Sequence, residues 1–233
     1  MNIKDYEIVK KLHGGNQSKS YLLKNGNVLK IFNMPYHVSE IERYKYFLKY
    51  KNDSFVFPLE FISDSDKLYG YIYKYIPGLT LSKCFNSSDL IGLSNNSKPL
   101  ENDIDFMSDA GITLYDFHDG NIIYNEKKYR VIDPDDYGLY SLDTEITNSY
   151  GQLYNPKLVV QNKNRSMHRI VICNLFISNL KSVPHTKLII DKISKYKKLE
   201  VFPSEIIMSV KEDLDRTFKD DIKTLDYLKR YSR

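Results

Sequence analysis

Asp116, Asn121 and Asp133 are the residues of this chain whose types and spacing are best suited to chemistry. They accompany two apolar, β-prone runs joined by a short polar turn, a pattern that predicts a hairpin with these side chains at its ends. Carboxylate and amide oxygens held near one another are ligands that suit Mg²⁺ and the phosphates of a nucleotide. The sequence therefore predicts a magnesium and nucleotide site within residues 115–136.

A second group of residues, near the N-terminus, has the order needed to reach those phosphates. Gly14 and Gly15 lie between the first two predicted strands, and Lys30 interrupts the apolar run of the third. A glycine loop that covers phosphates and a Lys that reaches them occur in this order. Taken alone, the glycines are more typical of a plain β-turn, and Lys30 of an outward-facing strand residue.

The elements that would position these residues begin with a small antiparallel sheet. Alternating and apolar runs predict five strands, and Asn25-Gly26 between the second and third is a strong hairpin signal. Apolar residues on one face predict an amphipathic helix over residues 40–48. The five predicted strands span residues 6–12, 20–23, 28–32, 55–62 and 68–76.

Two carboxylates of the predicted helix are candidates to pair with Lys30. Glu40 lies at the edge of the buried helix face and can turn inward, whereas Glu42 projects towards the polar side and is the fallback. For either residue, the alternative is a carboxylate at the start of a helix that offsets the helix dipole.

The remainder of the chain is predicted to be mainly helical. Pro77 cannot donate to a strand ladder and Gly78 permits a turn, so we predict a β-rich lobe over residues 1–76 and a second lobe over 77–233. We expect a loop beside a short helix at 86–102 and an irregular segment with short helices at 137–164. Helices are predicted at 103–111, 167–180, 188–198 and 204–230, the last with an apolar stripe of Leu214, Phe218, Ile222 and Leu225.

Composition restricts the class of protein. The 233 residues carry a formal net charge of +4 that is spread along the chain, so nucleic acid is not an expected partner. Cys84 and Cys173 are too few for a disulfide framework or a four-thiolate zinc site, which favours a cytoplasmic location. No run reaches about 18 apolar residues, so we expect neither secretion nor membrane insertion.

Several of these motifs, in order, resemble the protein kinase-like superfamily, including its branch of aminoglycoside and choline phosphotransferases. Residues 116–121 are similar to the Asp-x-His-x-Gly-Asn catalytic loop of that branch. Val131-Ile132-Asp133 resembles the strand that precedes the magnesium-binding Asp, and Val28-Leu29-Lys30 the Val-Ala-Ile-Lys strand. Residues 73–78 are similar to the hinge that holds adenine. The resemblance spans residues 6–137 and implies a two-lobed α+β kinase-like fold.

The resemblance also implies roles for individual residues. Lys30 would hold the α- and β-phosphates of ATP and Glu40 would orient it, under a phosphate loop that includes Gly14, Gly15 and Ser18. Asn121 and Asp133 would bind Mg²⁺, and Asp116 would take the proton of an acceptor hydroxyl. Backbone groups of Lys74 and Ile76 would contact adenine. We expect His118 to buttress the loop rather than to act as an acid or base, because a hydrogen-bonded structural His is the commoner case.

The chain also departs from the protein kinase pattern. Leu114 replaces the His of His-Arg-Asp, Pro134-Asp135 replaces Phe-Gly, and Ser18 replaces the last Gly of the phosphate loop. Asp135 and Asp136 are possible extra metal contacts or solvated turn acids. We expect a kinase that transfers phosphate from Mg-ATP to a hydroxyl, with a slight preference for protein Ser or Thr. A small-molecule kinase and a nucleotide-binding pseudokinase module are the alternatives.

Overall fold

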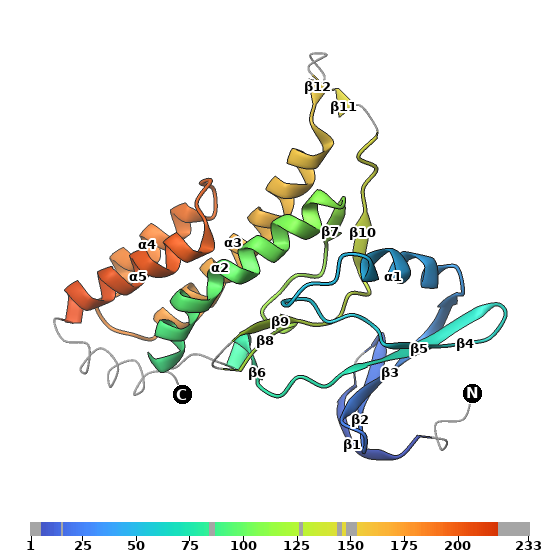
Figure 1. Ribbon diagram of the computed structural model, residues 1–233. Coiled ribbons are helices and arrows are strands. Elements are labelled where there is room, and N and C mark those ends of the chain that lie inside the picture. Colours follow the sequence, from blue (N-terminus) through green and yellow to red (C-terminus); the bar gives the residue numbers. More distant parts are fainter. Residues whose placement is uncertain are drawn as a thin grey trace. The chain divides into compact units, whose positions relative to one another are not determined.

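The computed structural model describes residues 6–14, 16–83, 87–125, 128–143, 146–147 and 153–218 (Figure 1). The chain forms two compact units. The first comprises residues 1–51 and 55–77, and the second comprises 52–54 and 78–233. Residues 52–54 belong to the second unit, because the backbone of Ser54 is hydrogen-bonded to Asp103 and to Val131 of that unit. Its N–H donates to Asp103 Oδ2 at 3.0 Å, and its carbonyl accepts from Val131 N at 2.6 Å.

The first unit contains an antiparallel five-stranded sheet in the order β1-β2-β3-β5-β4. Gly26, with a φ of 79°, makes the tight turn between β2 and β3, as the Asn-Gly signal predicts. The helix α1 covers Glu40–Leu48, which confirms the predicted amphipathic helix. The strands are β1 (Ile8–Gly14), β2 (Ser18–Leu23), β3 (Asn27–His37), β4 (Glu60–Ser63) and β5 (Lys67–Lys74).

Aromatic side chains join α1 to the sheet. Tyr44 of α1 is fully buried and lies 5.6 Å, between ring centroids, from Tyr71 of β5. Next to Tyr71, Gly70 allows the close approach of β3, because a Cβ there would clash with the Lys30 carbonyl oxygen. The strand that carries Lys30 is therefore held tightly on the β5 side.

One strand prediction in this unit is wrong in extent. The strand expected over residues 55–62 begins only at Glu60. Pro58 has no N–H to donate to a ladder. Phe55 forms only an isolated β-bridge, and Phe55 and Phe57 are both buried with stacked rings, so these two residues contribute mainly to packing.

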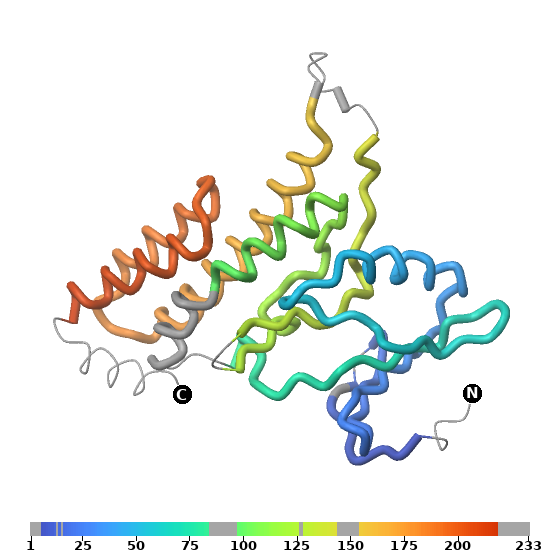
Figure 2. Tube along the Cα trace, viewed as in Figure 1, coloured from blue at the N-terminus to red at the C-terminus, as the bar shows by residue number. Residues whose placement is uncertain are grey.

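The second unit is built from long helices and short strand ladders. Helices α2 (Ser87–Asp109), α3 (Pro156–Leu180) and α5 (Pro203–Phe218) pack against one another, and α4 (Lys187–Tyr196) packs on α3 and α5 (Figure 2). Their buried core includes Ile104, Met107, Val160, Phe176, Ile207 and Leu214. The short elements are β6 (Leu79–Thr80), η2 (Leu81–Lys83), β7 (Ile112–Leu114), β8 (Ile122–Tyr124), β9 (Tyr129–Val131), β10 (Tyr137–Leu139), β11 (Ile146–Thr147) and β12 (Leu153–Tyr154).

Two predictions here need correction. The loop and short helix expected at 86–102 are the first part of α2, which continues through Pro99 to Asp109. A Pro inside a helix normally interrupts it. Pro99 and the surrounding Ser and Asn residues therefore favoured the prediction of a loop. The helix ends beside Gly111, whose φ is 73°.

The irregular segment expected at 137–164 contains β10 and the start of α3. The side chain of Asn155 caps α3, since its Oδ1 accepts from Lys157 N at 3.0 Å, and Pro156 occupies the first helical turn. Helix α3 therefore begins 11 residues before the predicted Met167. In α5 the stripe residue Leu214 is buried, whereas Ile222 and Leu225 lie outside the described residues. In the described part of the chain, no helix combines the length and apolarity needed to cross a membrane.

Candidate functional site

A β-hairpin brings two of the predicted metal ligands to one place. Strands β8 and β9 pair antiparallel, with Ile122 opposite Val131. Asn121 immediately precedes β8 and Asp133 follows β9, and Ile132 N donates to the Asn121 carbonyl at 2.9 Å. Asn121 and Asp133 therefore lie at the same end of the hairpin, as the sequence pattern predicts.

The loop before β8 brings Asp116 to Asn121. Asn121 Nδ2 donates to Asp116 Oδ2 at 2.8 Å and to the Asp116 carbonyl at 3.1 Å. In the described part of the chain these two bonds occupy the amide nitrogen of Asn121, and its Oδ1 accepts no hydrogen bond. The Asp116 carboxylate is thus oriented by a neutral donor, while an amide oxygen stays available as a ligand.

The buried Tyr137 interacts electrostatically with three acidic residues of this region. Burial, with the negative charges of Asp133, Asp116 and Asp135, raises the pKa of the Tyr137 hydroxyl well above its ordinary value. The carboxylates therefore act on one buried phenol. Asp133 also has a φ of 67°, a left-handed conformation that costs energy in a residue with a Cβ. Such strain occurs most often at functional sites.

His118 stabilises the same loop. Gly120 N donates to His118 Nδ1 at 3.0 Å, and His118 Nε2 lies 3.6 Å from Asp116 Oδ1. These contacts fit the expected buttressing role, because the ring bridges the backbone of the loop to its carboxylate.

Asn164 of α3 fixes the strand that leads into the loop, and sequence reasoning missed it. The side chain is fully buried. Its Oδ1 accepts from Leu114 N at 2.9 Å, and its Nδ2 donates to the Ile112 carbonyl at 2.8 Å and to Ser108 Oγ at 2.9 Å. The available signal was its four-residue spacing from Val160, which places a polar amide on an apolar helix face.

We expect Asn164→Leu to lower the free energy of unfolding by roughly 2–4 kcal/mol, because it leaves the Leu114 N–H and the Ile112 carbonyl buried without partners. Urea unfolding followed by circular dichroism measures this change. The matched control is Asn162→Leu, at an exposed position of the same helix, which should change stability by less than about 0.5 kcal/mol. Equal losses in the two variants would contradict the role given to Asn164.

His168, one helical turn after Asn164 in α3, packs against Phe117 of the loop. Its ring lies edge-on to Phe117, with 5.5 Å between centroids, and Phe117 stands between Asp116 and His118. Burial lowers the pKa of His168 to about 3, so the ring is neutral at physiological pH. A neutral imidazole here acts as packing rather than as an acid or base.

The low pKa of His168 predicts a pH dependence of stability. In the unfolded chain His168 has the ordinary His pKa of 6.5 and binds a proton below that pH. In the folded chain the same ring is protonated only below about pH 3, because burial lowers its pKa. The free energy of unfolding should therefore fall as pH falls through this window, by up to about 1.4 kcal/mol per pH unit. His168→Gln should flatten the slope between pH 6 and 4 in denaturant titrations, whereas His37→Gln, at an exposed position, should not. Unchanged slopes in both variants would refute the assignment.

In the first unit, Lys30 lies in the middle of β3, opposite Ser20 of β2 and Tyr71 of β5. It is 4% exposed, which excludes the alternative of an outward-facing strand Lys. Glu40 Oε2 lies 2.8 Å from Arg43 Nη2, and Glu42 Oε1 lies 2.8 Å from Lys45 Nζ. The proposed pairing of Lys30 with Glu40 stays a prediction.

The predicted phosphate loop and hinge are placed only in part. Gly14 ends β1 and the buried Ser18 begins β2, while Gly15 lies outside the described residues. Asn33 ties the end of this loop to β3, since its Nδ2 donates to the Asn16 carbonyl at 2.8 Å. Lys74 is the last residue of β5 and Ile76 follows it as a half-buried residue. Their contacts with adenine stay predictions.

Among the described residues, no group of three or more His, Cys, Asp or Glu is arranged to hold a metal ion. The Asn121 and Asp133 pair offers one amide oxygen and one carboxylate at the end of the hairpin. Any metal there would need further ligands from a substrate or from water.

Neither family models nor curated proteins supply a relative of this chain, since no protein-family model and no curated protein matches its sequence. The resemblance to the protein kinase-like superfamily therefore depends on the motifs quoted above.

Proposed function

We propose that this protein is an ATP-dependent phosphotransferase that moves the γ-phosphate of Mg-ATP to an acceptor hydroxyl. The observation that carries the proposal is the bond from Asn121 Nδ2 to Asp116 Oδ2, at the end of the hairpin where Asp133 follows β9. A base and two oxygen ligands then occur in one short stretch, which is the arrangement that phosphoryl transfer requires.

Asp116 is the proposed general base. Its side chain is 40% exposed, so an acceptor hydroxyl can approach it. Asn121 holds the Oδ2 side of the carboxylate and the backbone carbonyl, which fixes the direction of the remaining lone pairs. An oriented carboxylate within hydrogen-bond reach of the hydroxyl can accept its proton as the new bond to phosphorus forms.

Asn121 Oδ1 and the Asp133 carboxylate are the proposed ligands of Mg²⁺. Their chemistry fits, because Mg²⁺ takes oxygen ligands and is commonly held by one or two protein groups together with substrate phosphates. When bound, the ion would neutralise charge that develops on the phosphate oxygens. Because Asn121 also donates to Asp116, the same side chain sets the position of ligand and base.

The first unit supplies the proposed nucleotide contacts. Lys30 is assigned to the α- and β-phosphates, Glu40 to the orientation of Lys30, and Gly14, Gly15 and Ser18 to the covering loop. Backbone groups of Lys74 and Ile76 are assigned to adenine.

The acceptor is proposed to be a protein Ser or Thr, with a small-molecule hydroxyl as the alternative. The loop of residues 116–121 resembles the small-molecule branch, whereas only a short segment before Asp116 is free to form an acceptor pocket. A cytoplasmic location is part of the same proposal.

The test is incubation of the purified chain with Mg-ATP, alone and with panels of protein and small-molecule acceptors. Phosphate should appear on the chain itself or on at least one acceptor, with release of ADP. The proposal fails if a folded preparation transfers phosphate to none of them.

A nucleotide-binding module without turnover is the second candidate. The contact of Glu40 with Arg43 favours it, as does Ser18 where the phosphate loop of kinases has a glycine. ATP that binds only the folded chain raises its melting temperature whether or not transfer follows. Stabilisation by ATP in a preparation that transfers nothing would select this candidate.

A further inference from the structure

A cavity in the second unit involves none of the residues assigned to phosphoryl transfer. Its volume is about 380 Å³, within the range of small-molecule sites. One wall is a face of α3 and the other is the segment that leads into α5. The lining residues are Asn162, Arg165, Ser166, Arg169, Glu200, Val201, Phe202 and Pro203.

The α3 wall presents polar side chains by helical spacing. Asn162, Ser166 and Arg169 are four and three residues apart, so they lie on one face of the helix. Between them, Arg165 completes the same face. An amide, a hydroxyl and two guanidinium groups therefore line one side of the cavity.

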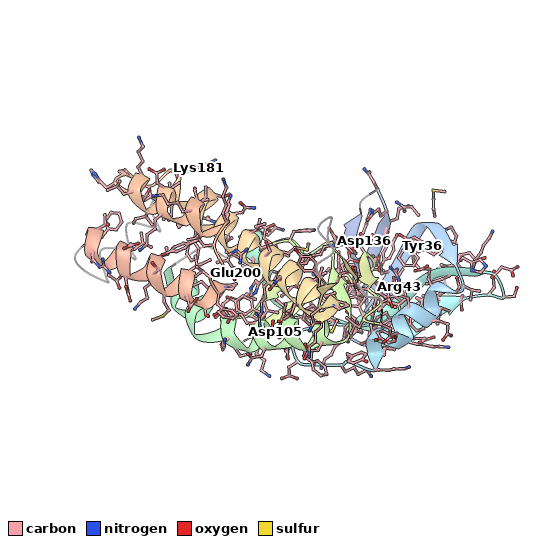
Figure 3. The ribbon with its side chains drawn as sticks, turned by 90° about the horizontal axis from the view of Figure 1, so that it is seen from above. Tyr36, Arg43, Asp105, Asp136, Lys181 and Glu200 are labelled. Carbon is pink, nitrogen blue, oxygen red and sulfur yellow. The ribbon has the colours of Figure 1, made fainter. Side chains whose placement is uncertain are left out.

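Arg165 is part of the frame of the cavity. Its Nε and Nη2 donate to the two carboxylate oxygens of Asp105 at 2.7 and 2.6 Å, and its guanidinium lies 5.1 Å from the Phe202 ring centroid. The hydrogen bond with Asp105 raises the pKa of Arg165, so its charge is permanent and compensated. Figure 3 labels Asp105 and Glu200 in this helical unit.

The opposite wall is held in place as well. Ser204 donates to the buried Glu101, from its backbone N at 2.7 Å and from Oγ at 3.1 Å. Phe202 N donates to Glu205 Oε2 at 3.0 Å. Because both walls are anchored by hydrogen bonds, the cavity is formed before any ligand arrives, which lowers the cost of binding.

Arg169 differs from Arg165 in its partners. Its Nη2 donates to Ser166 Oγ at 3.1 Å, whereas its Nε is buried and has no hydrogen-bond partner among the residues that the structure describes. Within the described ranges, no carboxylate forms an ion pair with Arg169. Arg169 lines the cavity as a guanidinium without a carboxylate counter-ion, so an anion in the cavity would supply the missing countercharge.

We propose that this cavity binds a small organic anion, with an oxyanion head on Arg169 and an apolar body against Val201 and Phe202. Planar guanidinium donors match the geometry of both carboxylate and phosphate. Ser166 and Asn162 can supply further hydrogen bonds to the head. The apolar residues of the opposite wall suit an aromatic or branched body.

Isothermal titration calorimetry with three aromatic probes tests the proposal. Benzoate and phenyl phosphate should bind with one-to-one stoichiometry, and neutral benzyl alcohol should bind at least tenfold more weakly. The stronger of the two anions identifies the head group. Saturating Mg-ATP should leave this binding unchanged, so failure here and failure of the phosphotransferase proposal are separate results. The inference is overturned if neither benzoate nor phenyl phosphate binds.

Variants locate the binding. Arg169→Gln should weaken the better anion by about tenfold or more, because a charge-assisted contact is lost. Arg216→Gln removes an Arg whose side chain is 72% exposed and should have no effect. Glu200→Gln, at an exposed position of the lining, should tighten binding about two- to fivefold, because it removes a negative charge that repels the anion. This variant replaces Arg169→Gln as the test if Arg169→Gln does not fold. The proposed site is wrong if folded Arg169→Gln binds the anion as tightly as the wild type does. If Arg169→Gln does not fold, the site is wrong if Glu200→Gln binds with wild-type affinity.

Discussion

Replacement of Asp116 by Asn is expected to lower the rate of phosphoryl transfer by about 10²–10⁴-fold, the usual contribution of a positioned general base. An amide cannot accept the hydroxyl proton. Its oxygen can still accept from Asn121 Nδ2, which lies 2.8 Å from Asp116 Oδ2, so the loop should keep its shape. Steady-state rates at saturating ATP, with binding of Mg-ATP measured separately, should show a loss of kcat without a loss of affinity.

Asp119→Asn is the matched control for this experiment, since it makes the same change three residues later in the same loop. Asp119 lies 3.9 Å from His118 Nδ1 and is assigned no part in catalysis, so its rate should stay within about twofold of wild type. The assignment of Asp116 is wrong if both variants lose the same fraction of activity, or if Asp116→Asn transfers phosphate normally.

Asp133→Asn is expected to remove most of the Mg²⁺-dependent part of ATP binding. Its carboxylate follows β9 in a left-handed conformation, with a φ of 67°. A neutral amide is a much weaker ligand for a hard divalent cation. At ATP concentrations near 100 times the dissociation constant, a ligand adds about 2.7 kcal/mol of stability, which is several degrees in melting temperature. Thermal unfolding with ATP, with and without Mg²⁺, measures the difference.

Two further variants make this result specific. Asp143→Asn, at an exposed position beyond β10, should retain the full Mg²⁺ effect, and Asp116→Asn should retain it as well. Loss of the effect in Asp143→Asn would indicate general charge screening rather than coordination. A full Mg²⁺ effect in Asp133→Asn would remove that residue from the metal site.

The parts of the candidate site that could be predicted from sequence are local. Asn121 and Asp133 flank two β-prone runs joined by a short turn, and alternation with turn chemistry is enough to predict their hairpin. The α1 helix and the turn at Gly26 have equally local signals, in one apolar helix face and an Asn-Gly pair. The contact of Asp116 with Asn121 follows because a short loop joins them.

The parts that could not be predicted depend on contacts distant in sequence. Asn164 bonds to Leu114 N across 50 residues, and no nearby residue indicates that partner. The cavity beside Arg169 needs the segment before α5 to pack on α3. Helix α2 was hidden because Pro99 has a poor helix propensity, which packing of the helix against α3 and α5 overrides.

The most direct test of the central claim follows the two labels of ATP separately. The wild-type chain is incubated with Mg²⁺ and either γ-labelled or α-labelled ATP, with the acceptor panels and with Asp116→Asn in parallel. We predict that the γ-label moves to a hydroxyl of the chain or of an acceptor, that the α-label stays in the nucleotide, and that Asp116→Asn transfers neither at a comparable rate. Retention of the γ-label in nucleotide or inorganic phosphate, or transfer of the α-label, would contradict a phosphotransferase.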